Sequence, residues 1–139
     1  MATSAISNQP SKALHITLWI LQILMTVPFI MGGFIKLATP MEQLSTQMPW
    51  VTPSLELLIR FIGLSEVLGA AGLIIPSLTR IRPSLTVWAA SGLALIMLFA
   101  FVFHLVRGEF TALPVNLAIG GLAVLVAWGR TKKAAIHPR

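Results

Sequence analysis

A carboxylate in the middle of a long apolar stretch is the feature of this sequence with the strongest chemical implication. Glu66 lies within Leu55–Ile75, which is long enough for one helix to cross the ~30 Å hydrocarbon core of a bilayer. It falls eleven residues after Leu55, about 16 Å along such a helix and near the membrane midplane. A carboxylate at that depth costs several kcal/mol unless it is protonated or partnered. We therefore expect Glu66 to face the interior of a helical bundle.

Four other polar residues lie near the ends of apolar stretches, and all four ends fall on the same side of a four-span protein: Lys36, Arg60, His104 and Asn116. An unperturbed histidine titrates near neutral pH, which suits proton transfer, and arginine can bind an oxyanion through two parallel hydrogen bonds. Each group is costly beside lipid. We expect Arg60, Glu66, His104 and Asn116 to converge on a pocket of a few hundred Å³, the usual size for a small ligand.

Structural roles for the same residues remain open. Lys36 can extend its ammonium group to the lipid headgroups. Glu56 precedes Arg60 by four residues, which favours an ion pair on one helix face. Asn116 can donate a hydrogen bond between helices. A sealed hydrogen-bonded network without room for a ligand is therefore the alternative to a pocket.

The apolar stretches that carry these residues predict an all-α fold, a polytopic four-helix transmembrane bundle in one domain (residues 14–130). A short helix on the membrane surface is expected in the first outer loop, between the first two spans. Pro76 is expected to end the second span, because proline lacks the backbone N–H that a helix interior requires. The spans cover approximately residues 14–37, 55–75, 84–106 and 111–128.

The regions that flank the bundle are expected to be simpler. Residues 1–13 predict a flexible N-terminal tail, and residues 131–139 a basic C-terminal tail, with fraying expected from Gly129 onward. The inner half of the bundle is expected to contain little that is polar except Gln22. Small residues inside the spans, namely Gly32, Gly33, Gly63 and Gly69, are expected to allow close helix packing.

Composition supports a membrane protein and excludes several kinds of site. Of the 139 residues, 56 % are hydrophobic and only 10 % charged, against about 25 % charged in soluble proteins. The absence of cysteine excludes disulfides and cysteine-ligated clusters. His15 and His137 lie at the opposite end from His104, so no metal site is expected. The sequence contains no autonomous catalytic motif and none for a covalently bound cofactor.

The distribution of basic residues predicts the orientation of the chain. One side of a four-span protein would carry seven of them: Lys12, Arg80, Arg82, Arg130, Lys132, Lys133 and Arg139. The other side would carry Lys36 and Arg107. Basic residues concentrate on the cytoplasmic side of membrane proteins. We therefore expect a multi-pass protein of the inner cell membrane with both termini cytoplasmic, and we attribute the net charge of +6 to this bias rather than to nucleic-acid binding.

Several segments together resemble the DoxX-like family of small bacterial membrane proteins. They are FIMGGFIKL at Phe29–Leu37, RFIGLSEVLGAAGLIIP at Arg60–Pro76, and His104 followed by the turn at residues 107–109 and by Asn116. The resemblance covers nearly all of residues 14–130. It implies a four-helix membrane bundle and a link to redox chemistry, because the protein that gives the family its name is a subunit of a thiosulfate:quinone oxidoreductase.

Two kinds of function follow from these observations. The first is a redox-associated membrane subunit, in which Glu66 and His104 bind the carbonyl groups of a quinone and an oxidoreductase partner subunit supplies the electrons. The second is a non-enzymatic binder or transporter of a small lipophilic or anionic solute, with Lys36 and Arg60 as anchors. An assembly scaffold is a further alternative. Contact with the lipid bilayer is common to all, and a homo-oligomer is compatible with each.

Overall fold

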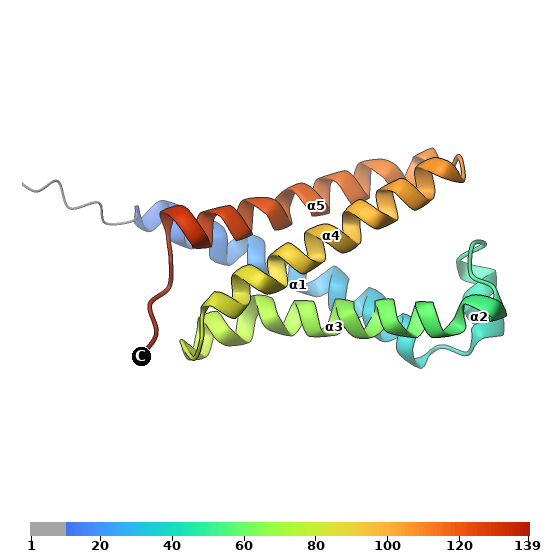
Figure 1. Cartoon of the computed structure of the whole chain (residues 1–139), viewed down its shortest axis with the longest axis horizontal. Helices are drawn as coiled ribbons and strands as arrows, with labels where there is room; N and C mark the ends of the chain where they lie inside the picture. The colour runs from blue at the N-terminus through green and yellow to red at the C-terminus, as the bar shows by residue number, and fades with distance from the viewer. Residues whose placement is uncertain (1–10) are drawn as a thin grey trace, which may run out of the picture.

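The computed structural model describes residues 11–139, and these residues form helices, turns and no β-strand. Short 3-10 turns at Pro53–Leu55 and Phe110–Ala112 lead into the third and fifth helices. The helices are α1 (Lys12–Ala38), α2 (Met41–Gln47), α3 (Glu56–Thr79), α4 (Ser84–Val106) and α5 (Leu113–Trp128) (Figure 1).

The sequence predicts an N-terminal tail at residues 1–13. Residues 1–10 of that range lie outside the described part of the chain. The end of that range is already ordered, because α1 begins at Lys12. Ser11 caps this helix, since its hydroxyl accepts a hydrogen bond of 3.1 Å from the backbone N–H of Leu14.

Four helical segments are long and apolar enough to cross a membrane: Lys12–Ala38, Pro53–Thr79, Ser84–Val106 and Phe110–Lys133. The predicted all-α four-helix bundle is therefore confirmed, and the predicted short helix between the first two spans is α2. Large apolar side chains, including Leu24, Phe34, Leu117 and Val124, are exposed on the outside of the bundle. Such exposure is expected where lipid rather than water surrounds a helix.

The long helices pack in the order of the chain: α1 against α3, α3 against α4, and α4 against α5, with a smaller contact between α5 and α1. The α4–α5 hairpin diverges from α3 toward the end of the bundle that carries α2 (Figure 1). We call this the α2 end. We call the opposite end, which contains Lys12, the α3–α4 turn and the C-terminal segment, the terminal end.

Two groups of buried side chains hold the bundle together. The larger group joins the long helices and includes Leu18, Met25, Leu73, Leu93 and Val126. The smaller group consists of Leu44, Val51 and Ile59, and attaches α2 and the segment after it to the start of α3. The connection between α1 and α3 is thus anchored to the bundle by apolar contacts.

The expectation that Pro76 ends the second span is wrong, because α3 continues through it to Thr79. Proline inside a membrane helix is tolerated where neighbouring helices satisfy the backbone groups that it frees. A neighbouring helix does contact this turn of α3, because the amide nitrogen of Gln22 in α1 donates a hydrogen bond to the carbonyl of Leu73 at 2.5 Å.

The expectation of a frayed segment from Gly129 onward is also wrong for its first residues. Residues Gly129–Lys133 extend α5 as a π-helical turn, and Arg130 is only 4 % exposed. Its side chain turns into the bundle, where Gln22 accepts a hydrogen bond from it at 2.7 Å. Arginine has a long apolar stem, which can pack along the bundle while the charged guanidinium group reaches a polar partner.

Candidate functional site

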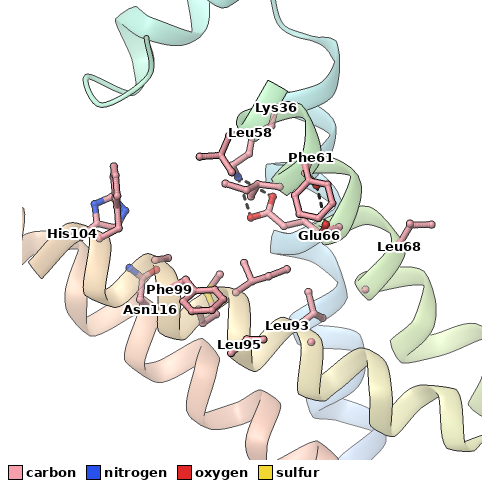
Figure 2. A pocket seen from close by; sticks show the side chains of 18 of the residues that line it. Lys36, Leu58, Phe61, Glu66, Leu68, Leu93, Leu95, Phe99, His104 and Asn116 are labelled. Atoms are coloured by element: carbon pink, nitrogen blue, oxygen red, sulfur yellow. Dashed lines mark hydrogen bonds and ion pairs between the residues drawn. The ribbon is translucent and has the colours of Figure 1, made fainter. Parts of the chain in front are cut away.

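A cavity of about 1070 Å³ lies between α3 and α4, and its lining runs along α4 from Ala89 to His104 at the α2 end. Most of its lining is apolar, with Leu58, Phe61 and Leu68 contributed by α3 and Leu95 and Phe99 by α4 (Figure 2). These five side chains are each at least half exposed on the outer surface of the bundle. The cavity therefore borders the surface that would face lipid, and it is larger than the predicted few hundred Å³.

An ion pair between Lys36 and Glu66 forms one wall of this cavity (Figure 2). The ammonium nitrogen of Lys36 lies 2.8 and 3.1 Å from the two carboxylate oxygens of Glu66, and the two side chains are only 12 % and 7 % exposed. The Lys36 nitrogen also donates to the carbonyl of Gly32 at 3.3 Å. Glu66 thus faces the bundle interior with a cationic partner, and that partner comes from α1.

Close packing of α1 on α3 brings these two residues together. Gly33 and Gly63 face each other at the crossing, and a Cβ atom placed on Gly33 would lie 2.7 Å from the Gly63 carbonyl oxygen. Gly69 lies farther along α3, where a Cβ atom would collide with Leu93 of α4. Gly32 differs, because a Cβ there would make only ordinary contacts with the ion pair.

Arg60 does not line the cavity. Its guanidinium group donates to the carbonyl of Lys36 and, at 2.9 Å, to that of Thr39, and it pairs with Glu56 at 3.2 Å. The last carbonyls of a helix have no partner within the helix and attract a cation. The expected convergence of Arg60 with Glu66, His104 and Asn116 is therefore incorrect for Arg60, which instead fastens α3 to the end of α1.

His104 lines the cavity at the α2 end, and residues of the α4–α5 turn hold its side chain in place. Its Nδ1 lies 2.6 Å from Glu109, whose other carboxylate oxygen accepts a hydrogen bond from Arg107 at 2.8 Å. An ionised carboxylate only accepts hydrogen bonds, so Nδ1 carries the proton and Nε2 is the second ring nitrogen available for a ligand. The hydrogen bond from His104, followed by that from Arg107, lowers the pKa of Glu109.

The segment between α2 and α3 closes the cavity at the same end. Met48 and Trp50 belong to the lining, and the Trp50 ring lies edge-on to those of Phe103 and His104, at centroid distances of 5.4 and 6.3 Å. Sequence reasoning missed both of these cavity residues. The signal was present, because a methionine and a tryptophan in a short connection are apolar enough to cover a bundle end.

Asn116 reaches the cavity from α5 and carries an unused donor. Its amide nitrogen is buried and has no hydrogen-bond partner among the described residues. Buried polar atoms are almost always paired, so an unpaired donor in a cavity wall is available to a ligand. Figure 2 shows Asn116 and His104 on one side of the cavity and the Lys36–Glu66 pair on the other.

The structure thus brings Lys36, Glu66, His104 and Asn116 to one cavity and leaves Arg60 outside it. The polar groups lie toward the α2 end, while the rest of the lining is apolar. No cluster of three or more metal-ligating side chains occurs in residues 11–139. Such a lining suits a molecule with a hydrogen-bonding head and an apolar body.

Comparison with known proteins gives one match. The family model of the DoxX-like family matches residues 20–126, which include α3, α4 and most of α1 and α5. Neither the curated proteins nor the solved structures give a significant match to the chain.

Proposed function

Since the chain belongs to the DoxX-like family and is an integral membrane protein, we propose that it is a redox-associated membrane subunit that binds a quinone or a similar small lipophilic molecule between α3 and α4. The observation that carries this proposal is the distribution of polarity in the 1070 Å³ cavity. Hydrogen-bonding groups gather at its α2 end, and aromatic and aliphatic side chains line the remainder.

The polar end of the cavity matches the head of a quinone. A quinone carbonyl accepts hydrogen bonds, and Asn116 has a buried amide donor without a partner. The Lys36 ammonium group places positive charge in the same wall, although its N–H groups already bind Glu66 and the Gly32 carbonyl. The unprotonated Nε2 of His104 would accept a hydrogen bond from the hydroxyl group of a quinol. Phe61 and Phe99 provide apolar surface for the ring and the tail. Because both are exposed on the outer surface, the ligand would enter sideways from the lipid.

Redox chemistry in this proposal is shared with a partner. Reduction of a quinone to a quinol consumes two electrons and two protons. Glu66 and His104 are the cavity groups that can exchange protons. The sequence has no cysteine and no cofactor motif, so the electrons come from an oxidoreductase partner subunit. Assembly with that partner, or as a homo-oligomer, belongs to the same proposal.

A titration of purified protein with a short-chain ubiquinone tests the binding. A ligand that binds only the folded protein raises the thermal midpoint. Gly92 lines the cavity and a Cβ there would meet open space, so Gly92→Leu adds bulk inside the cavity. Gly121 is equally open but lies outside the lining, so Gly121→Leu is the matched control. We expect the ubiquinone to raise the thermal midpoint of the wild type and of Gly121→Leu, and to raise that of Gly92→Leu by less.

The alternative function is non-enzymatic binding or transport of a small lipophilic or anionic solute, which the Lys36 ammonium group in the wall supports. A midpoint that rises with members of a solute panel but not with quinones would favour this alternative. If no compound raises the midpoint, a role in assembly is left, and both binding proposals fail.

We also propose the inner cell membrane as the location, with both termini cytoplasmic. The support is the distribution of charge along the bundle. Seven basic residues belong to the terminal end and its flanking segments: Lys12, Arg80, Arg82, Arg130, Lys132, Lys133 and Arg139. The cavity would then open toward the outer leaflet.

A further inference from the structure

Arg130 is a buried cation at the terminal end, far from the cavity described above. Its Nε donates to Gln22 at 2.7 Å, and one terminal nitrogen, Nη1, bonds to His15 at 3.0 Å and to the carbonyl of Ala134 at 3.2 Å. The guanidinium group also lies over the ring of Trp19, 5.5 Å from its centroid. The other terminal nitrogen, Nη2, is buried and has no partner among residues 11–139.

No carboxylate side chain compensates this charge. The sequence contains four acidic residues, and the first is Glu42. Three of them are paired near the α2 end: Glu56 with Arg60, Glu66 with Lys36, and Glu109 with His104 and Arg107. Glu42 lies in α2. A buried guanidinium group with only neutral partners is costly, and an anion from outside the chain would offset that cost.

A second cavity, of about 510 Å³, lies beside Arg130. Its lining includes Arg82 and Ser84, which stand at the start of α4, and Trp88 one turn later. Arg82 has a positive φ of 49°, an unusual conformation for a residue other than glycine. Backbone N–H groups at a helix start carry partial positive charge, and α4 has no side-chain cap there.

The C-terminal segment completes the wall of this cavity. Ala135, Ile136 and Pro138 contribute to its lining. The segment is held against the α3–α4 turn by Arg80, whose Nε donates to the carbonyl of His137 at 3.0 Å. The cavity is therefore lined by three parts of the chain: the α3–α4 turn with the start of α4, the end of α5 and the C-terminal segment.

We propose that this second cavity is a binding site for a phosphate group, held by Arg130 and Arg82 at the start of α4. Nη2 carries N–H groups without an acceptor among residues 11–139, and a phosphate oxygen would supply one in a charge-assisted hydrogen bond. Arg82 adds a second charge, and Ser84 adds a hydroxyl group. The phosphate belongs either to an anionic phospholipid headgroup or to a soluble phosphate compound.

The lining agrees with a site at the membrane boundary. Trp88 is 74 % exposed, and tryptophan is enriched at the level of the lipid headgroups. Lys133 lies over the ring of Trp128 on the same end, which adds positive charge at that level. A headgroup could therefore reach the cavity from the bilayer, and soluble phosphate from the aqueous side.

The test uses the full chain in detergent and in lipid nanodiscs. Sodium phosphate is titrated against sodium chloride of equal ionic strength, and nanodiscs of phosphatidylglycerol are compared with nanodiscs of phosphatidylcholine. The readout is the thermal midpoint, with native mass spectrometry to count retained phosphatidylglycerol. We expect at least one of the two phosphate sources to raise the midpoint. If only phosphatidylglycerol does so, the site takes a lipid headgroup; if sodium phosphate does so, it also takes free phosphate.

Matched variants separate the site from general surface charge. Arg82→Gln removes an exposed cavity arginine, and we expect it to weaken the apparent affinity about tenfold, the loss typical of one charge-assisted hydrogen bond. Lys132→Gln removes a charge from the same turn as Arg130 but outside the lining, and it should leave the affinity nearly unchanged. Arg130→Gln should abolish binding, and Arg82→Gln carries the test if that variant does not fold. No midpoint change with either source, or equal losses in Arg82→Gln and Lys132→Gln, would overturn the proposal.

Discussion

Lys36 and Glu66 each carry a charge that the bilayer interior penalises, and each offsets the other's cost. Their side chains are almost fully buried and approach within 2.8 Å. Removing one member of a buried ion pair leaves an uncompensated charge, which destabilises a protein far more than replacing both members by apolar residues. The pair is therefore a structural requirement of the bundle as well as a wall of the proposed ligand cavity.

We predict that Lys36→Met and Glu66→Leu each lower the free energy of unfolding by about 3–5 kcal/mol, while the double variant loses much less than their sum. The measurement is a double-mutant cycle by denaturant unfolding in detergent. The exposed pair Glu56 and Arg60 provides a comparison, because exposed i,i+4 pairs couple by only about 0.5 kcal/mol. Additive losses at positions 36 and 66 would show that the two charges are not coupled.

Glu109 gives the protein a predicted acid sensitivity. Its pKa lies below the ordinary value of 4.5 because His104 and Arg107 hydrogen-bond to the ionised form. A lowered folded-state pKa contributes stability above the unfolded-state value, and the contribution is lost as the pH falls through the folded-state value. As the pH is lowered below about 4.5, we expect the thermal midpoint of the wild type to fall more steeply than that of Glu109→Gln, which has no carboxylate to protonate at this position.

The control for this prediction is Glu42→Gln, which removes a carboxylate at the same end that forms no ion pair among the described residues. Its midpoint should follow the wild-type curve more closely than that of Glu109→Gln does. Identical curves for wild type and Glu109→Gln would mean that the turn at residues 107–109 does not contribute to acid stability.

At the scale of the elements, the crossing of α1 and α3 decides where the ion pair can form. Gly33 and Gly63 bring the two backbones into direct contact, which places Lys36 and Glu66 within reach of each other. Arg60 reinforces the same pair of helices by binding the terminal carbonyls of α1. By contrast, α3 and α4 diverge toward the α2 end (Figure 1). The cavity of about 1070 Å³ lies between them.

We predict that Gly33→Ala and Gly63→Ala each destabilise the bundle by about 1–3 kcal/mol, the usual cost of overpacking. The added Cβ atoms would lie 2.7 and 2.8 Å from backbone oxygens, and backbone cannot move aside as a flexible side chain can. Gly121→Ala is the control, since a Cβ there meets nothing within 4 Å and alanine favours the helix. Unfolding in detergent measures all three, and equal stability of the three variants would contradict a close crossing.

At the scale of the whole molecule, the two ends of the bundle have different polar chemistry. Near the α2 end, three carboxylates are paired with cations. Toward the terminal end, Gln22, Ser77, Thr86 and Arg130 form a buried network without an acid: Gln22 contacts both Arg130 and Ser77, and Ser77 contacts Thr86 at 2.8 Å. This asymmetry agrees with the proposed orientation, in which basic groups lie on the cytoplasmic side.

Single cysteines test that orientation directly, because the chain has none of its own. We predict that Thr46→Cys and Thr111→Cys, both exposed at the α2 end, react with an impermeant maleimide on intact cells. Lys12→Cys and Lys132→Cys at the terminal end should react only after lysis. The opposite pattern would reverse the orientation, and a mixed pattern within either pair would contradict four spans.

The sequence by itself determined the class of this protein. Long apolar stretches with few charges predict membrane helices, because lipid leaves the backbone no hydrogen-bonding partner except itself. The same reasoning indicated that Glu66 faces inward, since a carboxylate beside lipid is too costly. The resemblance to the DoxX-like family is confirmed by the match over residues 20–126. Composition and the length of the apolar stretches suffice for the helices and for Glu66, because both conclusions depend only on the solvent around each helix.

Only the tertiary structure decided which polar groups meet. Lys36 pairs with Glu66 in the wall of the cavity, whereas Arg60 lies outside the lining. The Gly33–Gly63 crossing decides this, because it sets the register of α1 against α3. The sequence placed Arg130 near the start of a tail, yet its side chain enters the bundle, because α5 continues by one further turn and brings the guanidinium group to Gln22 of α1. Partner choice depends on distances of a few ångströms between segments remote in sequence, and those distances are set by helix crossings that no single segment specifies.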